Sequence, residues 1–498
     1  MSGAPTIEFR VQGLAATCSN EFAEFFCANR PRWNPVKKRK ESNFVLLGTE
    51  DRKAGTITVG LGAVRHLVRL GVVQATLNFA DNPLQWQPLK AREDLFPGLQ
   101  FRPAQLEAIS AACATKLGNL VVPMAVGKTE VLLAVAKLAA QHHNVVILAP
   151  TAVTLNNLME RARSLKIPHV FHSKVLRSRV IPRVGAIIVS IGNDMAADDQ
   201  IDECNPHFRQ SVGTLLSDES QNWSKRGWLR VLSGLPNLLR SFSLSATSID
   251  VRDEKKLLAN MYYKSAYAIS GAGRVVYRAT VDETREYIDV PDLFSFHYEW
   301  MEQNCPPEPA EDEERLTWSQ HQAILAANVH RDKVVVAVLQ AIQASGRIAV
   351  VPLLTKAAAF KYLEKLDPER TFCWFGGDEV WRANGVKAKP EDVYAATQPG
   401  LMILATPHLD EGWSFNATNL ILFLEGKDPV SIVQRSGRTI RKSDVPPLLI
   451  NFQDSYGIFE FHGDTRRKLL RNYYKIPSGG LGSLKELKEL LSKHGKNL

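Results

Sequence analysis

A lysine and a threonine stand side by side where an apolar strand is expected to end and a helix to begin. In the segment VVPMAVGKTE, residues 121–130, Lys128 and Thr129 follow a glycine, and we expect a helix over Thr129–Ala140. Backbone N–H groups at a helix N-terminus can cradle a phosphate group. Lys128 would then reach the β- and γ-phosphates of a nucleotide, and the Thr129 hydroxyl would ligate Mg²⁺.

Two acidic residues end a later apolar run. In LLSDESQ, residues 215–221, Asp218 and Glu219 follow three residues of strand-like sequence. An acidic pair at the end of a neighbouring parallel strand would lie beside the phosphate loop. Asp218 can then hold the magnesium shell, while Glu219 orients and deprotonates an attacking water. An exposed acidic turn is the alternative interpretation of this pair.

Two arginines recur one helical turn apart in QRSGRTIRK, residues 434–442. This spacing lets the guanidinium groups of Arg438 and Arg441 point the same way. Such a pair can neutralise the charge that grows on a γ-phosphate during transfer. A solvated basic helix is the alternative interpretation.

The hydrophobic pattern predicts the strands and helices that would hold these residues at one edge of a sheet. Short runs of Val, Ile and Leu lack polar alternation, which is typical of parallel strands covered on both faces. Helical patterns lie between them, and this alternation predicts doubly wound α/β domains. The strands expected in a first domain are 119–123, 145–150, 186–190, 213–219 and 241–247. Those expected in a second domain are 348–352, 401–407, 420–426 and 447–452.

Composition sets the limits for partners and compartment. The 498 residues carry a formal net charge of +9, which permits a polyanionic partner. The six cysteines include no CxxC spacing, so neither a zinc site nor a redox motif is predicted. The N-terminus lacks the apolar core of a signal peptide, and no apolar run reaches the roughly 20 residues that cross a bilayer. We therefore expect a soluble intracellular protein.

The ordered set of motifs resembles the superfamily-2 helicases and translocases, over about residues 100–455. In that resemblance FRPAQ (101–105) looks like the adenine-recognising segment, and MAVGKT is similar to motif I. The remaining motifs are APTAVTLNN (149–157) for Ia, SIGN (190–193) for Ib, SDESQ for II, SATS (245–248) for III, ATPHLDEGWSF (405–415) for V and QRSGRTIRK for VI. The resemblance implies two tandem RecA-like domains with ATP in the cleft between them.

Carried over position by position, the resemblance implies ATP and Mg²⁺ as cofactors. The catalytic positions would be Lys128, Glu219, Gln434, Arg438 and Arg441. The nucleotide-binding positions would be Arg102, Gln105, Val126, Gly127, Lys128, Thr129, Glu130 and Gly412. The positions that contact nucleic acid would be Pro150, Thr151, Ser190, Gly192, Thr406 and Trp413, and the metal positions Thr129 and Asp218.

The chain departs from the family pattern at three places. Val122 stands at the position of the first glycine of the phosphate loop, and Ala125 stands where many such loops have another. Motif II is DESQ rather than DEAD, which argues against the largest group of RNA helicases.

The chain most resembles the phage recombination helicases of the UvsW kind. It is similar to them in its length, its small N-terminal region and its QxxGRxxRK pattern.

These observations together predict a domain order and a function. The expected parts are an accessory domain with duplex binding as its candidate role (1–96), RecA-like domains at 97–270 and 271–460, and a basic C-terminal tail (461–498). The expected function is that of an ATP-dependent DNA helicase or translocase that unwinds or branch-migrates forked and branched DNA in replication, recombination or repair. A monomer in the cytoplasm or host-cell cytoplasm, associated with the nucleoid and with no membrane partner, fits this role. A non-DEAD RNA helicase, or an ATP-gated nucleic-acid clamp without unwinding, are the alternatives, so RNA stays open as a partner.

Overall fold

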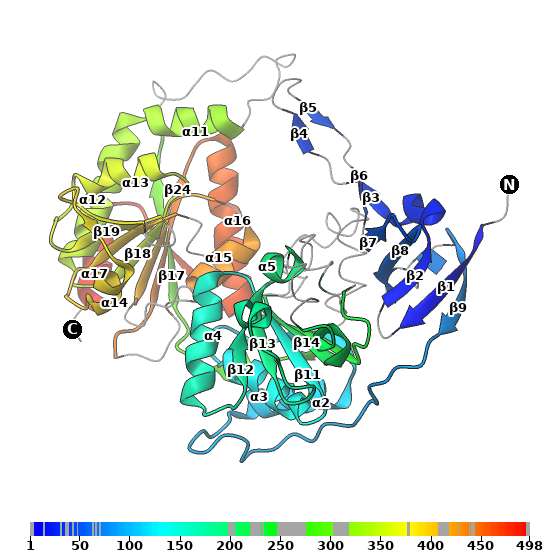
Figure 1. The fold of residues 1–498 in the computed structure, drawn as a ribbon. Coiled ribbons are helices and arrows are strands. Elements are labelled where there is room, and N and C mark those ends of the chain that lie inside the picture. Colours follow the sequence, from blue (N-terminus) through cyan, green and yellow to red (C-terminus); the bar gives the residue numbers. More distant parts are fainter. Residues whose placement is uncertain are drawn as a thin grey trace. The chain divides into compact units, whose positions relative to one another are not determined.

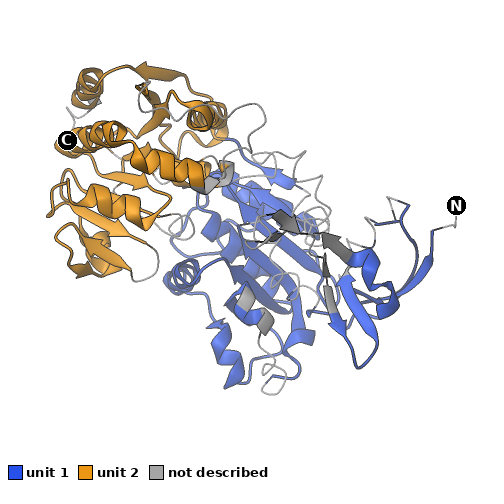
Figure 2. Cartoon of the chain, turned by 90° about the horizontal axis from the view of Figure 1, so that it is seen from above, with its two compact units in different colours: residues 1–280 blue, residues 281–498 orange. Residues whose placement is uncertain are grey.

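The computed structural model of the chain divides into two compact units, Met1–Thr280 and Val281–Leu498 (Figure 1 and Figure 2). Each unit is described by itself. The description covers the chain apart from residues 1–3, 13–14, 30–31, 35–38, 42–43, 47, 62–63, 65–66, 69–70, 198–204, 220–230, 232–233, 247–274, 302–317, 376–378, 407–417, 427, 438, 440–443 and 495–498.

The first unit begins with a mixed five-stranded sheet in the order β7-β8-β2-β1-β9. Its strands are β1 (Thr6–Gln12), β2 (Ala15–Ser19), β7 (Gly48–Asp51), β8 (Thr56–Gly60) and β9 (Gln74–Phe79). Along β1 the side chains alternate between exposed and buried, as a strand with one covered face requires. The ring of Phe9 meets Phe26 edge to face, with the ring centroids 5.9 Å apart.

The first unit also contains two short two-stranded sheets within residues 27–46 and a seven-stranded parallel sheet, in the order β12-β13-β11-β14-β15-β10-β16. Its strands are β10 (Leu117–Val121), β11 (Asn144–Ala149), β12 (Val170–His172), β13 (Ile187–Ile191), β14 (Val212–Asp218), β15 (Arg240–Ser245) and β16 (Val275–Arg278). Every residue of β11 and β15 is buried, because helices pack on both faces of a doubly wound sheet.

Helices alternate with these strands and begin at recognisable caps. They are α2 (Pro103–Ala114), α3 (Lys128–Ala140), α4 (Ala152–Ser164), α5 (Gly192–Ala197) and α7 (Phe208–Ser211). Proline occupies the first turn of α2, where its missing N–H costs nothing. The loops that precede α3 and α4 follow the carboxyl ends of β10 and β11, which is the edge where such sheets place their binding sites.

The second unit contains a nine-stranded sheet in the order β21-β20-β19-β22-β18-β23-β24-β17-β25. Its strands are β17 (Asp292–Tyr298), β18 (Ala349–Pro352), β19 (Thr371–Trp374), β20 (Val380–Arg382), β21 (Lys387–Ala388), β22 (Met402–Ala405), β23 (Leu420–Phe423), β24 (Leu448–Asp454) and β25 (Ser478–Leu481). Strand β20 pairs antiparallel with both β19 and β21, and the other pairs are parallel.

The helices of the second unit are α11 (Trp318–Ala327), α12 (Val329–Ala344), α13 (Lys356–Leu363), α14 (Pro390–Ala395), α15 (Pro429–Ser436), α16 (Gly457–Tyr474) and α17 (Leu484–His494). The predicted class, α/β with two doubly wound domains in tandem, is confirmed. Residues 478–481 form an edge strand paired with β17, so part of the stretch that the sequence presents as a basic tail belongs to this sheet. Within the described residues, no helix combines the length and apolar character that crossing a membrane requires.

Candidate nucleotide and nucleic-acid site

The predicted phosphate loop lies between β10 and α3, as the sequence indicates. Gly127 is the N-cap of α3 and has a φ of 99°. Ala125, two residues earlier, also has a positive φ, of 62°. Positive φ values that alternate along a loop turn backbone N–H groups toward one point, which is the arrangement of an anion-binding nest. The residues present therefore suit a phosphate group, although Ala125 replaces a glycine.

Two residues at the start of α2 bind the backbone of this loop. Arg102 donates from Nη1 to the carbonyl oxygen of Ala125 over 3.0 Å. Gln105 donates from Nε2 to the carbonyl oxygen of Gly127 over 3.0 Å, and its Oε1 accepts the N–H of Arg102. A Cβ at Gly127 would collide with the Gln105 amide, so only glycine permits this approach. The segment expected to recognise adenine thus lies directly against the phosphate loop.

Lys128, the first residue of α3, and Glu219, the residue directly after β14, form an ion pair. Their Nζ and Oε1 atoms are 3.4 Å apart, and each side chain is 13% exposed. The Sδ atom of Met124 lies 3.8 Å from the same Nζ. The structure therefore brings together the two residues that the sequence assigns to the phosphates and to the attacking water.

Glu219 has a φ of 63°, in the left-handed region that favours glycine. Its backbone N–H donates to the carbonyl oxygen of Leu244 on β15 over 2.8 Å, which holds this conformation in place. A non-glycine residue in this region costs about 1–3 kcal/mol, and such strain persists where the surroundings impose it. The strain sits on the residue that the sequence assigns as the base.

The metal positions are also at this edge. Thr129 is the second residue of α3, and Asp218 is the last residue of β14. Among the described residues no group of three or more His, Cys, Asp or Glu side chains gathers as a metal site. Mg²⁺ at nucleotide sites takes one or two protein ligands, with phosphate oxygens and water completing the octahedron. A hydroxyl and one carboxylate therefore fit this ion.

Arg161 is a residue that sequence reasoning missed. Its Nε lies 2.7 Å from Oε1 of Glu130, which the sequence assigns to the nucleotide site. The pair joins α3 to α4 directly behind the phosphate loop. Motif spacing carries no signal for it, because the two residues are 31 positions apart and meet only when α3 and α4 pack together.

The hydroxyls predicted to contact nucleic acid have different surroundings. Thr151 caps α4, its oxygen accepting the N–H of Thr154 over 3.2 Å, and Pro150 precedes it in the half-buried loop after β11. Ser190, in contrast, is fully buried and its hydroxyl lies 2.9 Å from that of Ser173. Gly192 is buried at the start of α5. Of these four, Pro150 and Thr151 are the residues with exposed surface.

In the second unit, Thr406 and Gln434 are both buried. The Thr406 hydroxyl donates to the carbonyl oxygen of Phe375 over 3.2 Å, so it ties the end of β22 to the end of β19. Gln434 lies on α15 and is 4% exposed. The remaining predicted positions of this unit lie outside the described residues, namely Gly412, Trp413, Arg438 and Arg441.

Comparison with known proteins identifies the fold. No protein-family model and no curated protein sequence matches the chain. Among solved structures, S. cerevisiae Dbp5 bound to RNA and ADP BeF3 matches at a TM-score of 0.51 and 14% identity, over 80% of this chain and 98% of that one.

Two further solved structures match the chain. The ATP-dependent Type ISP restriction-modification enzyme LlaBIII bound to DNA matches at a TM-score of 0.51 and 12% identity, over 80% of this chain and 32% of that chain. T4 UvsW matches at 13% identity over 96% of this chain and 99% of that one, with a TM-score of 0.35. The two structures that match at a TM-score of 0.51 show that the chain shares their tandem RecA-like fold.

Proposed function

We propose that the chain is an ATP-dependent nucleic-acid helicase or translocase, with ATP hydrolysed at the carboxyl edge of the first unit's parallel sheet. The observation that carries this proposal is the Lys128–Glu219 pair, with its glutamate in a strained backbone conformation. The tandem RecA-like fold supports it, because that fold is shared with Dbp5 in a structure bound to RNA and ADP BeF3.

The pairing suggests how phosphate binding would activate the base. Lys128 and Glu219 are close enough to neutralise each other. A β/γ-phosphate that draws the Lys128 ammonium toward itself releases the Glu219 carboxylate, which can then accept a proton from water. Thr129 and Asp218 would hold Mg²⁺, which when bound neutralises charge on the β- and γ-phosphate oxygens. The nest formed by Ala125–Gly127 would hold the phosphates through backbone N–H groups.

Other residues complete this proposal. Arg102, Gln105, Val126, Glu130 and Gly412 would shape the nucleotide site. From the second unit, Gln434 would act on the attacking water, and Arg438 and Arg441 would stabilise charge on the γ-phosphate in the transition state. This role rests on the sequence pattern QRSGRTIRK.

Nucleic acid would be gripped by its phosphates, which gives the sequence-independent binding that a motor needs. Pro150 and Thr151 are the best-placed candidates, since they have exposed surface at the carboxyl edge of β11. For Ser190, Gly192 and Thr406 we propose a supporting role through the backbone, because the structure buries them. Trp413 would stack on a base.

Forked or branched DNA is the substrate we propose, with branch migration or unwinding as the outcome and a monomer as the acting form. The basic stretch at residues 30–40 and the net charge of +9 support a polyanionic partner. RNA is the second candidate, because Dbp5, one of the matching structures, is bound to RNA. Phosphate contacts do not separate the two, whereas contacts to the 2′-OH do.

A substrate panel tests the proposal. ATP turnover and strand displacement are measured with matched forked DNA, plain DNA duplex, single-stranded DNA and RNA duplex. The expected result is stimulated turnover with all the DNA substrates and displacement best on forks. Greater displacement of RNA duplexes would replace the DNA assignment with the RNA one. Binding with stimulated turnover but no displacement on any substrate would favour the ATP-gated clamp.

A further inference from the structure

In the connection between β23 and α15, three consecutive residues each form a hydrogen bond to a different element. Residues 424–426 follow the last residue of β23 and lead toward α15. Helix α15 carries Gln434, and Arg438 and Arg441 follow it in the sequence. Whatever fixes this connection therefore also fixes where α15 begins.

Two buried arginines hold the first and third of these residues by their carbonyl oxygens. Arg331 on α12 donates from Nη2 to the Leu424 oxygen over 3.4 Å. Arg466 on α16 donates from Nη1 to the Gly426 oxygen over 2.8 Å. Arg331 is 1% exposed and Arg466 is 2% exposed, so neither guanidinium exchanges these bonds with bulk water.

The side chain of the middle residue, Glu425, holds a third element. Its Oε2 accepts the backbone N–H of Leu354 over 3.3 Å, and Leu354 lies between β18 and α13. Burial raises the pKa of Glu425, and the nearby Arg331 guanidinium opposes this rise. The connection is thus bonded to α12, to the loop after β18 and to α16.

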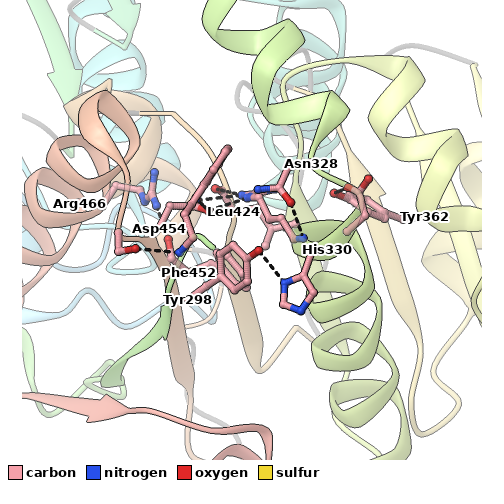
Figure 3. Close-up of polar contacts among 12 residues, drawn as sticks. Tyr298, Asn328, His330, Tyr362, Leu424, Phe452, Asp454 and Arg466 are labelled. Carbon is pink, nitrogen blue, oxygen red and sulfur yellow. Dashed lines mark hydrogen bonds and ion pairs between the residues drawn. The ribbon is translucent and has the colours of Figure 1, made fainter. Parts of the chain in front are cut away.

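The arginines are themselves held in fixed orientations. Arg331 grips both carboxylate oxygens of Asp454, over 2.7 Å and 3.1 Å. Arg466 donates from Nε to Oδ1 of Asn451 over 2.8 Å and from Nη2 to the Phe452 carbonyl oxygen over 2.6 Å. Figure 3 shows Asp454 at the end of β24, Leu424 just after the neighbouring strand β23, and Arg466 on α16. The groups that accept these bonds, on Asn451, Phe452 and Asp454, belong to the last four residues of β24.

Stability alone explains this cluster poorly. Burying a guanidinium costs several kcal/mol, and well-packed apolar residues often replace a buried ion pair at no loss of stability. Burial lowers the pKa of Arg466 to about 10, with Asp454 opposing the shift, so the group keeps its charge at neutral pH. What a guanidinium offers and an apolar side chain does not is several directed donors in one plane. Those donors fix loop carbonyls in position.

The same helix, α16, also holds the far end of α15. The hydroxyls of Tyr474 and Ser436 are 2.8 Å apart, and both are buried. Ser436 donates its own hydrogen to the Val433 carbonyl oxygen, so Tyr474 is the donor to Ser436. Arg466 and Tyr474 are eight residues apart, roughly 12 Å along the helix, which is also about the length of the eight-residue α15.

We propose that α16 is a clamp that positions α15 for catalysis, with Arg466 as the positioning residue at its start and Tyr474 at its end. This inference rests on the proposed ATPase function and adds to it two residues outside all the family-like motifs. The clamp keeps Gln434, and the residues that follow α15, in the geometry that the transition state requires. A shift of such groups slows the chemical step more than it weakens ATP binding.

The test uses variants that remove one hydroxyl and keep the surrounding packing. Tyr474→Phe and Ser436→Ala each remove the hydrogen bond between Tyr474 and Ser436. The double variant removes the same single hydrogen bond. Tyr362→Phe is the matched control, because its buried hydroxyl donates to Oδ1 of Asp332 over 3.0 Å and has no bond to α15. For each protein, kcat and KM for ATP are measured together with Tm.

We expect Tyr474→Phe and Ser436→Ala to lower kcat about fivefold or more, with KM for ATP within about twofold of the wild type. The double variant should lose no more than the larger of the two single losses. Tyr362→Phe should lower Tm by a similar amount and keep its kcat.

Equal kcat values for Tyr474→Phe and Tyr362→Phe at equal Tm would overturn the clamp and leave the proposed function standing. Additive losses in the double variant would also overturn it, since the two hydroxyls would then act separately. A wild-type protein that turns over no ATP would overturn the proposed function itself. These failures are therefore distinguishable.

Discussion

Glu219 links the chemistry of the site to its backbone. A glutamate in the left-handed region is costly, and here the cost accompanies a contact with the phosphate-loop lysine. The N–H bond to Leu244 fixes the residue at the end of β14 while its side chain points to Lys128. We interpret the strain as preorganisation, because it aims a carboxylate at the place where the water must lose its proton.

Lys128→Ala should lower ATP turnover by about 10²-fold or more. The reason is that the segment 121–130 then has no lysine or arginine to direct at the β/γ-phosphates. The fold should persist, since the ammonium is partly exposed and its partner Glu219 can then be solvated. Steady-state turnover and Tm are the measurements.

The control for this lysine lies on the same helix. Lys137 donates to the Leu95 carbonyl oxygen over 2.8 Å, away from the phosphate loop. Lys137→Ala should lower Tm and keep turnover within about twofold. Equal loss of turnover in the two variants would mean that α3 is damaged as a whole and that Lys128 has no special role.

At the residue scale, the sequence predicts some of the site and not the rest. The positions of Lys128, Thr129, Asp218 and Glu219 are predictable, because each lies at the end of a strand or after it, and an apolar run marks that strand. The bond from Arg102 to the loop and the pair formed by Arg161 are not, since they depend on how helices distant in sequence pack together.

At the scale of elements, continuous apolar runs predict five strands of the first doubly wound sheet and four of the second, β18, β22, β23 and β24. Edge elements do not follow from such runs. Strand β12 has three half-buried residues, and β25 contains two glycines, so neither shows a periodic pattern. β17 is not among the strands that the apolar runs predict, yet it pairs along its full length with β24. Its assignment depends on that long-range pairing.

The cap of α4 offers a test that separates folding from binding. Thr151→Ala should cost about 1 kcal/mol of unfolding free energy, because the helix loses its cap. Thr151→Asp should keep that stability, since aspartate caps as well, but should weaken binding to nucleic acid through charge repulsion with phosphates. Urea unfolding and a titration with labelled DNA are the two measurements.

A charge control belongs to the same helix. Ser164→Asp places a carboxylate at the exposed other end of α4 and should leave binding unchanged. If Thr151→Asp binds DNA as tightly as the wild type, Thr151 is a cap and no more, and our proposal for this loop is wrong.

Strand β11 is preceded by a buried histidine that predicts a pH dependence. Burial lowers the pKa of His143 to about 4, and the charge of Arg240 adds to this effect. His143 lies 2.8 Å from the Thr214 hydroxyl. Below its unfolded pKa near 6.5 the unfolded chain takes up a proton that the folded chain refuses, so stability falls as the pH drops toward 4.

The measurement compares urea unfolding at pH 7 and pH 5 in the wild type and in His143→Gln. The wild type should lose about 2 kcal/mol more than the variant between these two pH values. The comparison between the two proteins cancels the other titrating groups. An identical pH dependence in both proteins would show that His143 does not titrate as its burial implies.

At the scale of the whole molecule, the chain combines a mixed N-terminal sheet with two doubly wound sheets. The tandem α/β class is predictable because apolar runs alternate twice with helical patterns. The N-terminal sheet is not, since its short strands carry mixed polar and apolar residues and no motif. Its basic stretch at residues 30–40 is the sequence feature that points to a polyanion.

The measurement that tests the central claim most directly uses Glu219→Gln, with ATP binding, ATP turnover and strand displacement followed on one forked DNA. We predict that the variant binds ATP at least as tightly as the wild type, because Lys128 no longer has a charged partner. Turnover should fall by about 10²–10⁴-fold, since an amide accepts no proton from water, and displacement should disappear with it. Turnover and displacement close to those of the wild type would contradict the account, because Glu219 would then not be the base and its strained pairing with Lys128 would not mark the ATPase site.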